Sequence, residues 1–389
     1  MPEFREALPL SLYVHVPWCV RKCPYCDFNS HQARGEIPED DYIAALIADL
    51  EAALPLVWGR RVSSIFFGGG TPSLLSGAAL EKLLVAIRMR IAVLPEAEIS
   101  LEANPGTVEA EKFDAFRRAG VNRLSLGIQS FDTDHLRALG RIHDGDEARR
   151  AIETAATHFD NFNLDLMYGL PGQSIEQARR DLECALAFAP PHLSCYQLTL
   201  EPNTAYAAAP PDLPESDLCA DMQDAIEARL AEAGYTHYET SAFARPGRQC
   251  RHNLNYWTFG DYLGIGAGAH SKLTVPGTDG WQVRRQMRWK QPKQYHERVA
   301  SGGAVQEEFC VTDEDLPFEF MMNALRLNQG FDASLYALRA GLPLSGVENT
   351  LAEAEQDGLI TRQDGRIAPT VRGRRFLNLL LQRFLAGPE

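Results

Sequence analysis

Three cysteines lie within eight residues near the start of the chain, in the stretch HVPWCVRKCPYCDF. Cys19, Cys23 and Cys26 follow the pattern C-x₃-C-x₂-C. A closed structural zinc site takes four protein ligands, and a disulfide takes two. Three thiolates can instead bind three irons of a [4Fe–4S] cluster and leave the fourth iron open to a ligand that is not protein. The alternatives are zinc with a distant ligand, a redox thiol pair, and cysteines with no shared function.

Other residue types suited to ligand binding follow the expected strands. The run Gly68–Gly70 ends a strand-like segment, and its missing side chains allow the backbone to approach a ligand closely. Glu102, Gln129 and Asp165 lie near the ends of three later segments, and Arg141 follows in GRIHD. Because α/β barrels place their chemistry at the carboxyl ends of parallel strands, we expect these residues to share one end of one sheet.

The elements that must position these residues alternate along the first half of the chain. Strand-like segments are SLYVHV, SSIFF, ISLEA, NRLSLGI, NFNLDLM and HLSCYQLTL. Helices are expected from Pro38 to about Leu54, near 77–91 and near 107–119, and after each later strand. Six strand–helix units of this regularity predict a parallel α/β sheet.

The strands alternate polar and apolar residues, whereas parallel strands covered on both faces are apolar throughout. Ile99 and Leu101 oppose Glu102, for example, and Leu164 opposes Asp165. Successive side chains point to opposite faces, so neighbouring strands expose a polar row on one side. The sequence therefore predicts an open, partial (β/α)₆ barrel with a polar interior and helices outside.

Composition limits the class of partner. The chain has 389 residues, 45% hydrophobic residues and a formal net charge of −14, so no nucleic-acid partner is expected. No apolar run approaches the roughly 20 residues that span a bilayer. The N-terminus lacks the basic-then-apolar order of a signal peptide, so we expect a cytoplasmic protein with reduced thiols.

Three regions are expected. Residues 1–245 form the barrel, 246–310 form a connecting segment without clear periodicity, and 311–389 form a winged-helix-like domain. Within the last region we expect three helices, a hairpin around an Asp-Gly turn in LITRQDGRIAPT, and one final helix from about Thr370 to Leu385.

C-x₃-C-x₂-C after a first strand resembles the radical S-adenosylmethionine (SAM) enzymes. Nearly the whole chain is similar to the anaerobic coproporphyrinogen oxidases and their relatives, through YVHVPWC, FFGGGTPS, EANPG, SLGIQSF, LGRIH and DLMYGLPGQ. The resemblance implies a cluster whose open iron is chelated by SAM, with one or two SAM molecules bound. The implied SAM contacts are Tyr13, Tyr25, Gly69, Gly70, Thr71, Glu102, Gln129, Arg141 and Asp165.

Two departures from the oxidases favour HemW-type haem chaperones, which share the fold. Phe28 occupies the position of a fourth oxidase cysteine, and only about ten residues precede the first strand. The HNLNYW stretch, residues 252–257, matches the haem-binding motif of that group. The resemblance makes His252 the candidate haem ligand, because a neutral imidazole is a natural axial ligand. A hydrogen-bonding loop histidine is the alternative, and Cys250 is a rival ligand.

A basic segment offers a second feature for haem recognition. WQVRRQMRWKQP, residues 281–292, contains Arg284, Arg285, Arg288 and Lys290. Arginine suits carboxylates, so the segment could pair with haem propionates. A solvated edge on an acidic protein is the more ordinary interpretation, and it is the one we expect.

The resemblance implies a cytoplasmic, or peripherally membrane-associated, protein that binds haem, SAM and a [4Fe–4S] cluster. Its partners would be acceptor haemoproteins, including membrane-bound respiratory proteins, and a reductant for the cluster. One alternative is an enzyme, either an oxygen-independent coproporphyrinogen III oxidase or another radical SAM enzyme acting on a tetrapyrrole. The other is a regulatory protein whose cluster senses redox state.

Overall fold

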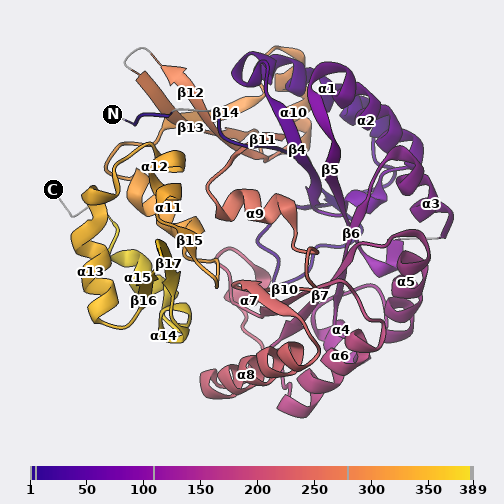
Figure 1. The fold of residues 1–389 in the computed structure, drawn as a ribbon. Helices are drawn as coiled ribbons and strands as arrows, with labels where there is room; N and C mark the ends of the chain where they lie inside the picture. The colour runs from indigo at the N-terminus through magenta and orange to yellow at the C-terminus, as the bar shows by residue number, and fades with distance from the viewer. Residues whose placement is uncertain (1, 5–6, 108–109, 278–279, 386–389) are drawn as a thin grey trace.

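A curved sheet of 12 strands forms the centre of the molecule. The computed structural model describes residues 2–4, 7–107, 110–277 and 280–385. The strand order is β14-β13-β12-β11-β1-β4-β5-β6-β7-β8-β10-β9. In Figure 1 the sheet bends into an open arc, with α1, α2, α3, α5, α6 and α8 around its outside and α9 in its opening.

The six predicted strands are confirmed as a parallel run at the middle of this sheet. They are β1 (Leu10–Val16), β4 (Arg61–Gly69), β5 (Ala92–Ala103), β6 (Arg123–Gln129), β7 (Phe162–Tyr168) and β8 (His192–Gln197). The helices between and after them are α1 (Glu39–Ala53), α2 (Gly77–Arg90), α3 (Ala110–Ala119), α4 (Thr133–Ala138), α5 (Gly145–His158), α6 (Ile175–Ala187), α7 (Ala205–Ala208) and α8 (Ser216–Glu232). Part of the expected start of α3, residues 108–109, lies outside the described residues.

Local sequence explains why the helices begin after the strands that they follow. The Ser76 side chain accepts from the Ala79 N–H at the start of α2. Asp144 and Ser174 form reciprocal capping boxes at the starts of α5 and α6. Such caps satisfy backbone donors that a helix start would otherwise leave unpaired, so local sequence fixes where these three helices begin.

The two faces of the strands differ as the alternation predicts. Leu101, Leu124 and Leu164 are fully buried in the core between sheet and helices. Glu102 and Asp165, one residue further along their strands, face a cavity instead. The helices therefore cover one face of the sheet, and the other face is left to line a polar interior.

Residues that follow position 245 extend the same sheet. Strand β11 (Asp261–Ile265) pairs parallel to β1, and β12 (His270–Gly277), β13 (Gly280–Arg288) and β14 (Val305–Cys310) follow antiparallel. The short strands β9 (Thr236–Glu239) and β10 (Ala242–Ala244) complete its other end. Helix α9 (Arg251–Trp257) precedes β11, and α10 (Pro292–Ala300) lies between β13 and β14.

The arginines of the basic segment are held by carboxylates of this chain, so the expected solvated edge is wrong for its buried members. Arg288 is 1% exposed and pairs with Asp49 at 3.3 Å, and Arg285 pairs with Glu319. Arg284, which is less buried, lies 3.3 Å from Glu308. These pairs explain why β13 shows no simple polar–apolar alternation in sequence.

The C-terminal region packs in a second hydrophobic cluster around Phe320, Leu351 and Leu380, which also includes Phe259 and Val283. It contains α11 (Leu316–Ala324), α12 (Ser334–Ala340), α13 (Glu348–Gln356) and a small sheet of β15 (Phe331–Asp332), β16 (Ile360–Gln363) and β17 (Arg366–Pro369). The hairpin is confirmed, since Asp364 and Gly365 take φ values of 51° and 76° between β16 and β17.

The prediction of one final helix from about Thr370 to Leu385 is wrong. The chain forms α14 (Val371–Arg375) and α15 (Leu377–Gln382), because Phe376 leaves the helical region with φ −112° and ψ 37°. After this break Leu380 and Leu381 pack into the C-terminal cluster. A single non-helical residue inside an otherwise helical pattern has no signature in sequence. No helix in the described part of the chain combines the length and apolarity needed to cross a membrane.

Candidate functional site

The residues proposed from the sequence to hold the cluster and SAM, together with His252, line one cavity of about 540 Å³. Its walls are the polar face of the sheet, the cysteine loop and helix α9. The candidates brought together there are Tyr13, Cys19, Cys23, Tyr25, Cys26, Gly69, Gly70, Thr71, Glu102, Gln129, Arg141, Asp165 and His252. Residues from positions 13 to 252 therefore meet at one site that no short motif spans.

The cysteine loop leaves the end of β1 and is closed at its base by two short paired strands, β2 (Trp18–Cys19) and β3 (His31–Gln32). Lys22 reaches across the loop and donates to the carbonyl oxygens of Phe28 and Ser30 at 3.2 and 3.3 Å. All three cysteines are free and partly buried. The sequence therefore folds locally into a loop that directs three thiols to one end of the cavity.

The donor set of the loop fits a cluster. Burial raises the pKa values of the Cys19 and Cys26 thiols, so bound metal would have to supply the positive charge that holds them as thiolates. Among the residues that the structure describes, no three His, Cys, Asp or Glu side chains are gathered as ligands of a single metal ion. The Arg141 guanidinium donates to the Cys23 sulfur at 3.7 Å.

The glycine loop lies directly against the cysteine loop. Gly69 has φ +113°, a region that favours glycine, and a Cβ there would lie 2.5 Å from the His15 ring. A Cβ on Gly70 would lie 2.5 Å from the Trp18 carbonyl oxygen. The Gly69 N–H donates to the Glu102 carboxylate at 3.2 Å. Glycine is therefore required at both positions for the backbone to reach this place.

Glu102 is the carboxylate beside the glycine loop. Burial, together with the nearby charge of Asp165, raises the pKa of Glu102 to about 8, although the Gly69 hydrogen bond opposes the shift. The side chain is therefore largely protonated at neutral pH in the ligand-free protein. A cationic ligand group beside it would favour the ionised form.

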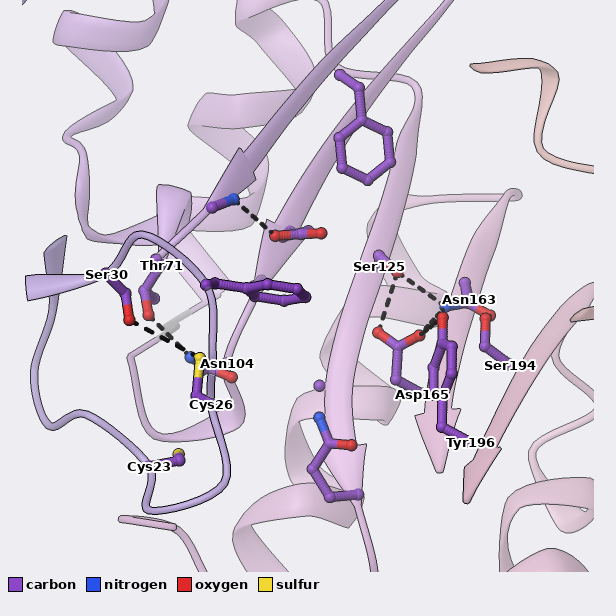
Figure 2. A pocket seen from close by; sticks show the side chains of 18 of the residues that line it. Cys23, Cys26, Ser30, Thr71, Asn104, Ser125, Asn163, Asp165, Ser194 and Tyr196 are labelled. Atoms are coloured by element: carbon purple, nitrogen blue, oxygen red, sulfur yellow. Dashed lines mark hydrogen bonds between the residues drawn. The ribbon is translucent and has the colours of Figure 1, made fainter. Parts of the chain in front are cut away.

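A hydrogen-bonded network surrounds Asp165 on the opposite side of the cavity from the cysteines (Figure 2). Asp165 accepts from Asn163 at 2.7 Å and from Ser125 at 3.2 Å. Asn163 in turn accepts from Ser194 at 3.0 Å and contacts His192 at 2.6 Å. The strand alternation placed Ser125 and Asn163 on the polar face, but we assigned neither of them a role from the sequence.

Gln129 and Arg141 connect the strand ends to the cysteine loop. Gln129 has φ +67°, which is uncommon for a residue with a side chain and often marks a functional position. Arg141 donates to the Gly127 carbonyl oxygen at 2.8 Å and to the side chain of Asn104. Since Arg141 also reaches Cys23, it spans from β6 to the thiols.

Helix α9 carries His252 into the barrel. The His252 side chain is buried, and its Nδ1 lies 3.0 Å from the Ser64 hydroxyl. The rings of Phe66, Tyr256 and Tyr13 surround it, with centroids 5.0, 5.2 and 6.4 Å away. Its Nε2 has no hydrogen-bond partner among the described residues. Burial, aided by Arg123, lowers the pKa of His252 to about 3, so the imidazole is neutral.

Cys250, the rival ligand, lies away from the cavity. Its side chain is fully buried, and its thiol donates to the Glu98 carboxylate at 3.5 Å. Burial raises the pKa of Cys250 to about 12. A thiol held protonated by a carboxylate is a poor metal ligand, so His252 is the better placed of the two.

The fold and its cysteine loop define a radical SAM protein. The Radical SAM superfamily profile matches residues 13–185, and the HemN C-terminal domain profile matches residues 311–376. The solved structure of coproporphyrinogen III oxidase (HemN) from Escherichia coli, described as a radical SAM enzyme, has a TM-score of 0.81 and 28% identity. The match covers 97% of this chain and 90% of that one.

Two relatives narrow the class to one family. Proteins named heme chaperone HemW from Escherichia coli K12 and Haemophilus influenzae are each 48% identical to this chain, over 379 and 382 residues. Both matches cover 97% of this chain and 98% of the relative. The chain belongs to the HemW family of radical SAM proteins.

Proposed function

We propose that this protein is a haem chaperone that binds haem in the barrel cavity and delivers it to acceptor haemoproteins. The observation that carries the proposal is a buried, neutral His252 whose Nε2 has no hydrogen-bond partner among the described residues, at the cavity that gathers the residues proposed for the cluster and SAM. A neutral imidazole nitrogen is a common axial ligand of haem iron. The relatives named heme chaperone HemW support the same cargo.

Cys19, Cys23 and Cys26 would hold the [4Fe–4S] cluster, and the glycine loop with Glu102, Gln129, Arg141 and Asp165 would hold SAM. All of these residues line the same cavity. When bound, the cluster would supply an electron for reductive cleavage of SAM, given an external reductant. The residues of this chain exclude water, position the ligand through Gly69 and Gly70, and place Glu102 beside it.

Iron ligation by His252 requires a local rearrangement. The imidazole is 3% exposed, and its Nε2 is covered in the ligand-free protein. Tyr256 lies on the same helix and stacks on Tyr262 at 4.1 Å between ring centroids. We infer that haem entry displaces one or more of the rings of Tyr13, Phe66 and Tyr256 that surround His252, so that Nε2 becomes accessible from the cavity.

The acceptors that we propose are respiratory-chain haemoproteins, with delivery in the cytoplasm or at the membrane surface. Oxidative decarboxylation of coproporphyrinogen is the second candidate, favoured by the similarity to HemN over nearly the whole chain. The position of the fourth oxidase cysteine weighs against it, because Phe28 stands there and is 61% exposed at the cavity wall.

Haem binding and transfer test the proposal. We expect wild-type protein to form a Soret complex that survives gel filtration and passes haem to an apo-haemoprotein. We expect His252→Ala to weaken haem binding about tenfold or more, because the iron loses its imidazole. His296→Ala, which changes an exposed histidine on α10, is the matched control.

An unchanged Soret complex in His252→Ala would remove this histidine from the haem site. Coproporphyrinogen incubated with reconstituted protein, SAM and reductant tests the second candidate. Decarboxylation there would overturn a function limited to haem delivery.

A further inference from the structure

Arg123 is a buried cation that no described residue neutralises directly. It is the first residue of β6, its side chain is 2% exposed, and it lines the cavity. Its Nε has no hydrogen-bond partner, and none of the described carboxylates lies within ion-pair distance of its guanidinium. Burying an unpaired charge is costly, so a position of this kind calls for an explanation.

Arg123 differs in this respect from the other two fully buried basic side chains in the described part of the chain. Lys272 lies 3.0 Å from Asp261, and Arg288 lies 3.3 Å from Asp49. Those two cations hold strands together and have their counter-ions within the fold. Arg123 has an open cavity in front of it instead.

The nearest acidic groups are occupied by other donors. Glu98 and Asp165 both raise the pKa of Arg123 through their charge. The Glu98 carboxylate accepts from the backbone N–H groups of Arg251 and His252, at 3.2 and 3.1 Å, and so anchors the start of α9. Asp165 accepts from Asn163 and Ser125. Neither carboxylate pairs with the guanidinium.

Arg123 also lies far from the thiol end of the cavity. Gln129 ends the strand that Arg123 begins, so about 20 Å of extended chain separates the two Cα atoms. His252 and His192 line the same cavity as Arg123, and burial, together with the charge of Arg123, lowers the pKa values of both imidazoles. This part of the cavity wall therefore contains a guanidinium and, once the rings around His252 move, an imidazole nitrogen without a partner among the described residues. The pair suits a ligand that carries both a metal ion and a negatively charged group.

We propose that Arg123 binds a carboxylate of the ligand in this cavity, and that this carboxylate is a propionate of the metal-tetrapyrrole whose iron His252 ligates. The assignment rests on the haem-binding function proposed above. A guanidinium can donate two parallel hydrogen bonds to one carboxylate, which gives position as well as affinity. The other source of a carboxylate is the methionyl group of SAM, and the experiment separates the two.

The first arm uses wild-type protein and compares haem with haem dimethyl ester, in which the propionates carry no charge. We expect the ester to bind about tenfold more weakly in a Soret titration, since charge-assisted hydrogen bonds to Arg123 are lost. Equal affinities for haem and ester overturn the assignment. This arm needs no variant, so a folding defect cannot obscure it.

The second arm uses Arg123→Gln, with Arg117→Gln, an exposed arginine on α3, as the control for loss of one charge. We expect Arg123→Gln to reduce haem affinity about tenfold and to abolish the difference between haem and ester. Arg117→Gln should retain the wild-type haem affinity and the preference for haem over the ester. Arg123→Gln that still prefers haem to the ester overturns the proposal.

SAM affinity, measured in cluster-reconstituted protein, identifies the source of the carboxylate. We expect it to be unchanged in Arg123→Gln. Weakened SAM binding with unchanged haem binding would assign Arg123 to the SAM carboxylate and overturn the tetrapyrrole assignment. The absence of any wild-type Soret complex overturns the proposed function and this assignment together, whereas a complex indifferent to esterification overturns only the role of Arg123.

Discussion

Single residues decide how closely the glycine loop and the cysteine loop approach each other. At Gly69 and Gly70 the space that a side chain would need is filled by His15 and by the Trp18 carbonyl group. At His252 burial keeps the imidazole neutral, and its Nε2 is buried without a hydrogen-bond partner in the described part of the chain. The chemistry of the site therefore depends on the absence of side chains at Gly69 and Gly70 as much as on the imidazole of His252.

Gly70→Ala is expected to weaken SAM binding about tenfold or more and to lower the melting temperature. The added Cβ would lie 2.5 Å from the Trp18 carbonyl oxygen, so the glycine loop would have to move away from the cysteine loop. Calorimetric titration of SAM into cluster-reconstituted protein measures the effect. Gly346→Ala is the control, because a Cβ there meets open space. Normal SAM affinity in Gly70→Ala would place SAM away from this loop.

The secondary-structure elements determine how α9 and the C-terminal region meet the barrel. The start of α9 is fixed by Glu98 of β5, and Arg326 after α11 lies over the Trp257 ring at 4.7 Å. Glu239 of β9 forms a backbone bridge to Leu327 beside this contact. The end of the haem-motif helix is therefore in contact with the C-terminal region.

Glu239 makes this junction sensitive to pH. Burial raises the pKa of Glu239 to about 7, although Arg326 opposes the shift. In the unfolded chain the Glu239 carboxyl has its usual pKa of about 4.5, so between pH 4.5 and 7 it is protonated in the folded protein and ionised in the unfolded chain. The contribution of Glu239 to the free energy of unfolding therefore falls as the pH rises through this range.

Glu239→Gln should remove this dependence. Relative to wild type, we expect the variant to gain stability between pH 5 and pH 8, by up to about 3 kcal/mol. Urea unfolding at the two pH values measures the gain. Glu232→Gln, at the exposed end of α8, should show no such trend. A difference from wild type that does not vary with pH would contradict the raised pKa.

The molecule as a whole depends on pairings between distant parts of the chain. Strand β11 pairs with β1 across some 250 residues, from Leu10 to Asp261. Asp261 is fully buried at this junction, where it lies 2.8 Å from Arg60 and 3.0 Å from Lys272. Its pKa is lowered by both cations despite its burial. The triad joins the residue before β4, Arg60, to the late strands β11 and β12.

Asp261→Ala is expected to cost about 3–5 kcal/mol of unfolding free energy, because it leaves two buried or half-buried cations without their shared partner. Denaturant midpoints measure the loss. Asp40→Ala is the control, since it breaks an ion pair with Lys82 in which both side chains are exposed and should cost no more than about 1 kcal/mol. Equal small effects of the two substitutions would show that the triad is not needed to hold the sheet.

The sequence alone determined the features that depend on spacing along the chain. Three cysteines in eight residues, the alternation within ISLEA and NFNLDLM, and the Asp-Gly turn are each contained in a short segment. Periodicity fixes which face of a strand is polar, and turn chemistry fixes where a hairpin bends. The parallel barrel strands and the hairpin were therefore predictable, and the radical SAM resemblance followed from the motifs.

Only the tertiary structure decided what depends on distant partners. It brought His252 beside Tyr13, paired β11 with β1 and broke the last helix at Phe376. It also gave Arg288 a counter-ion and left Arg123 without one among the described residues. A lone arginine or histidine in sequence carries no sign of its partners. Side chains from distant parts of the chain decide whether such a residue is buried and whether its charge is neutralised. A neutralised side chain forms a structural ion pair, whereas a buried side chain without a partner is a candidate for ligand binding.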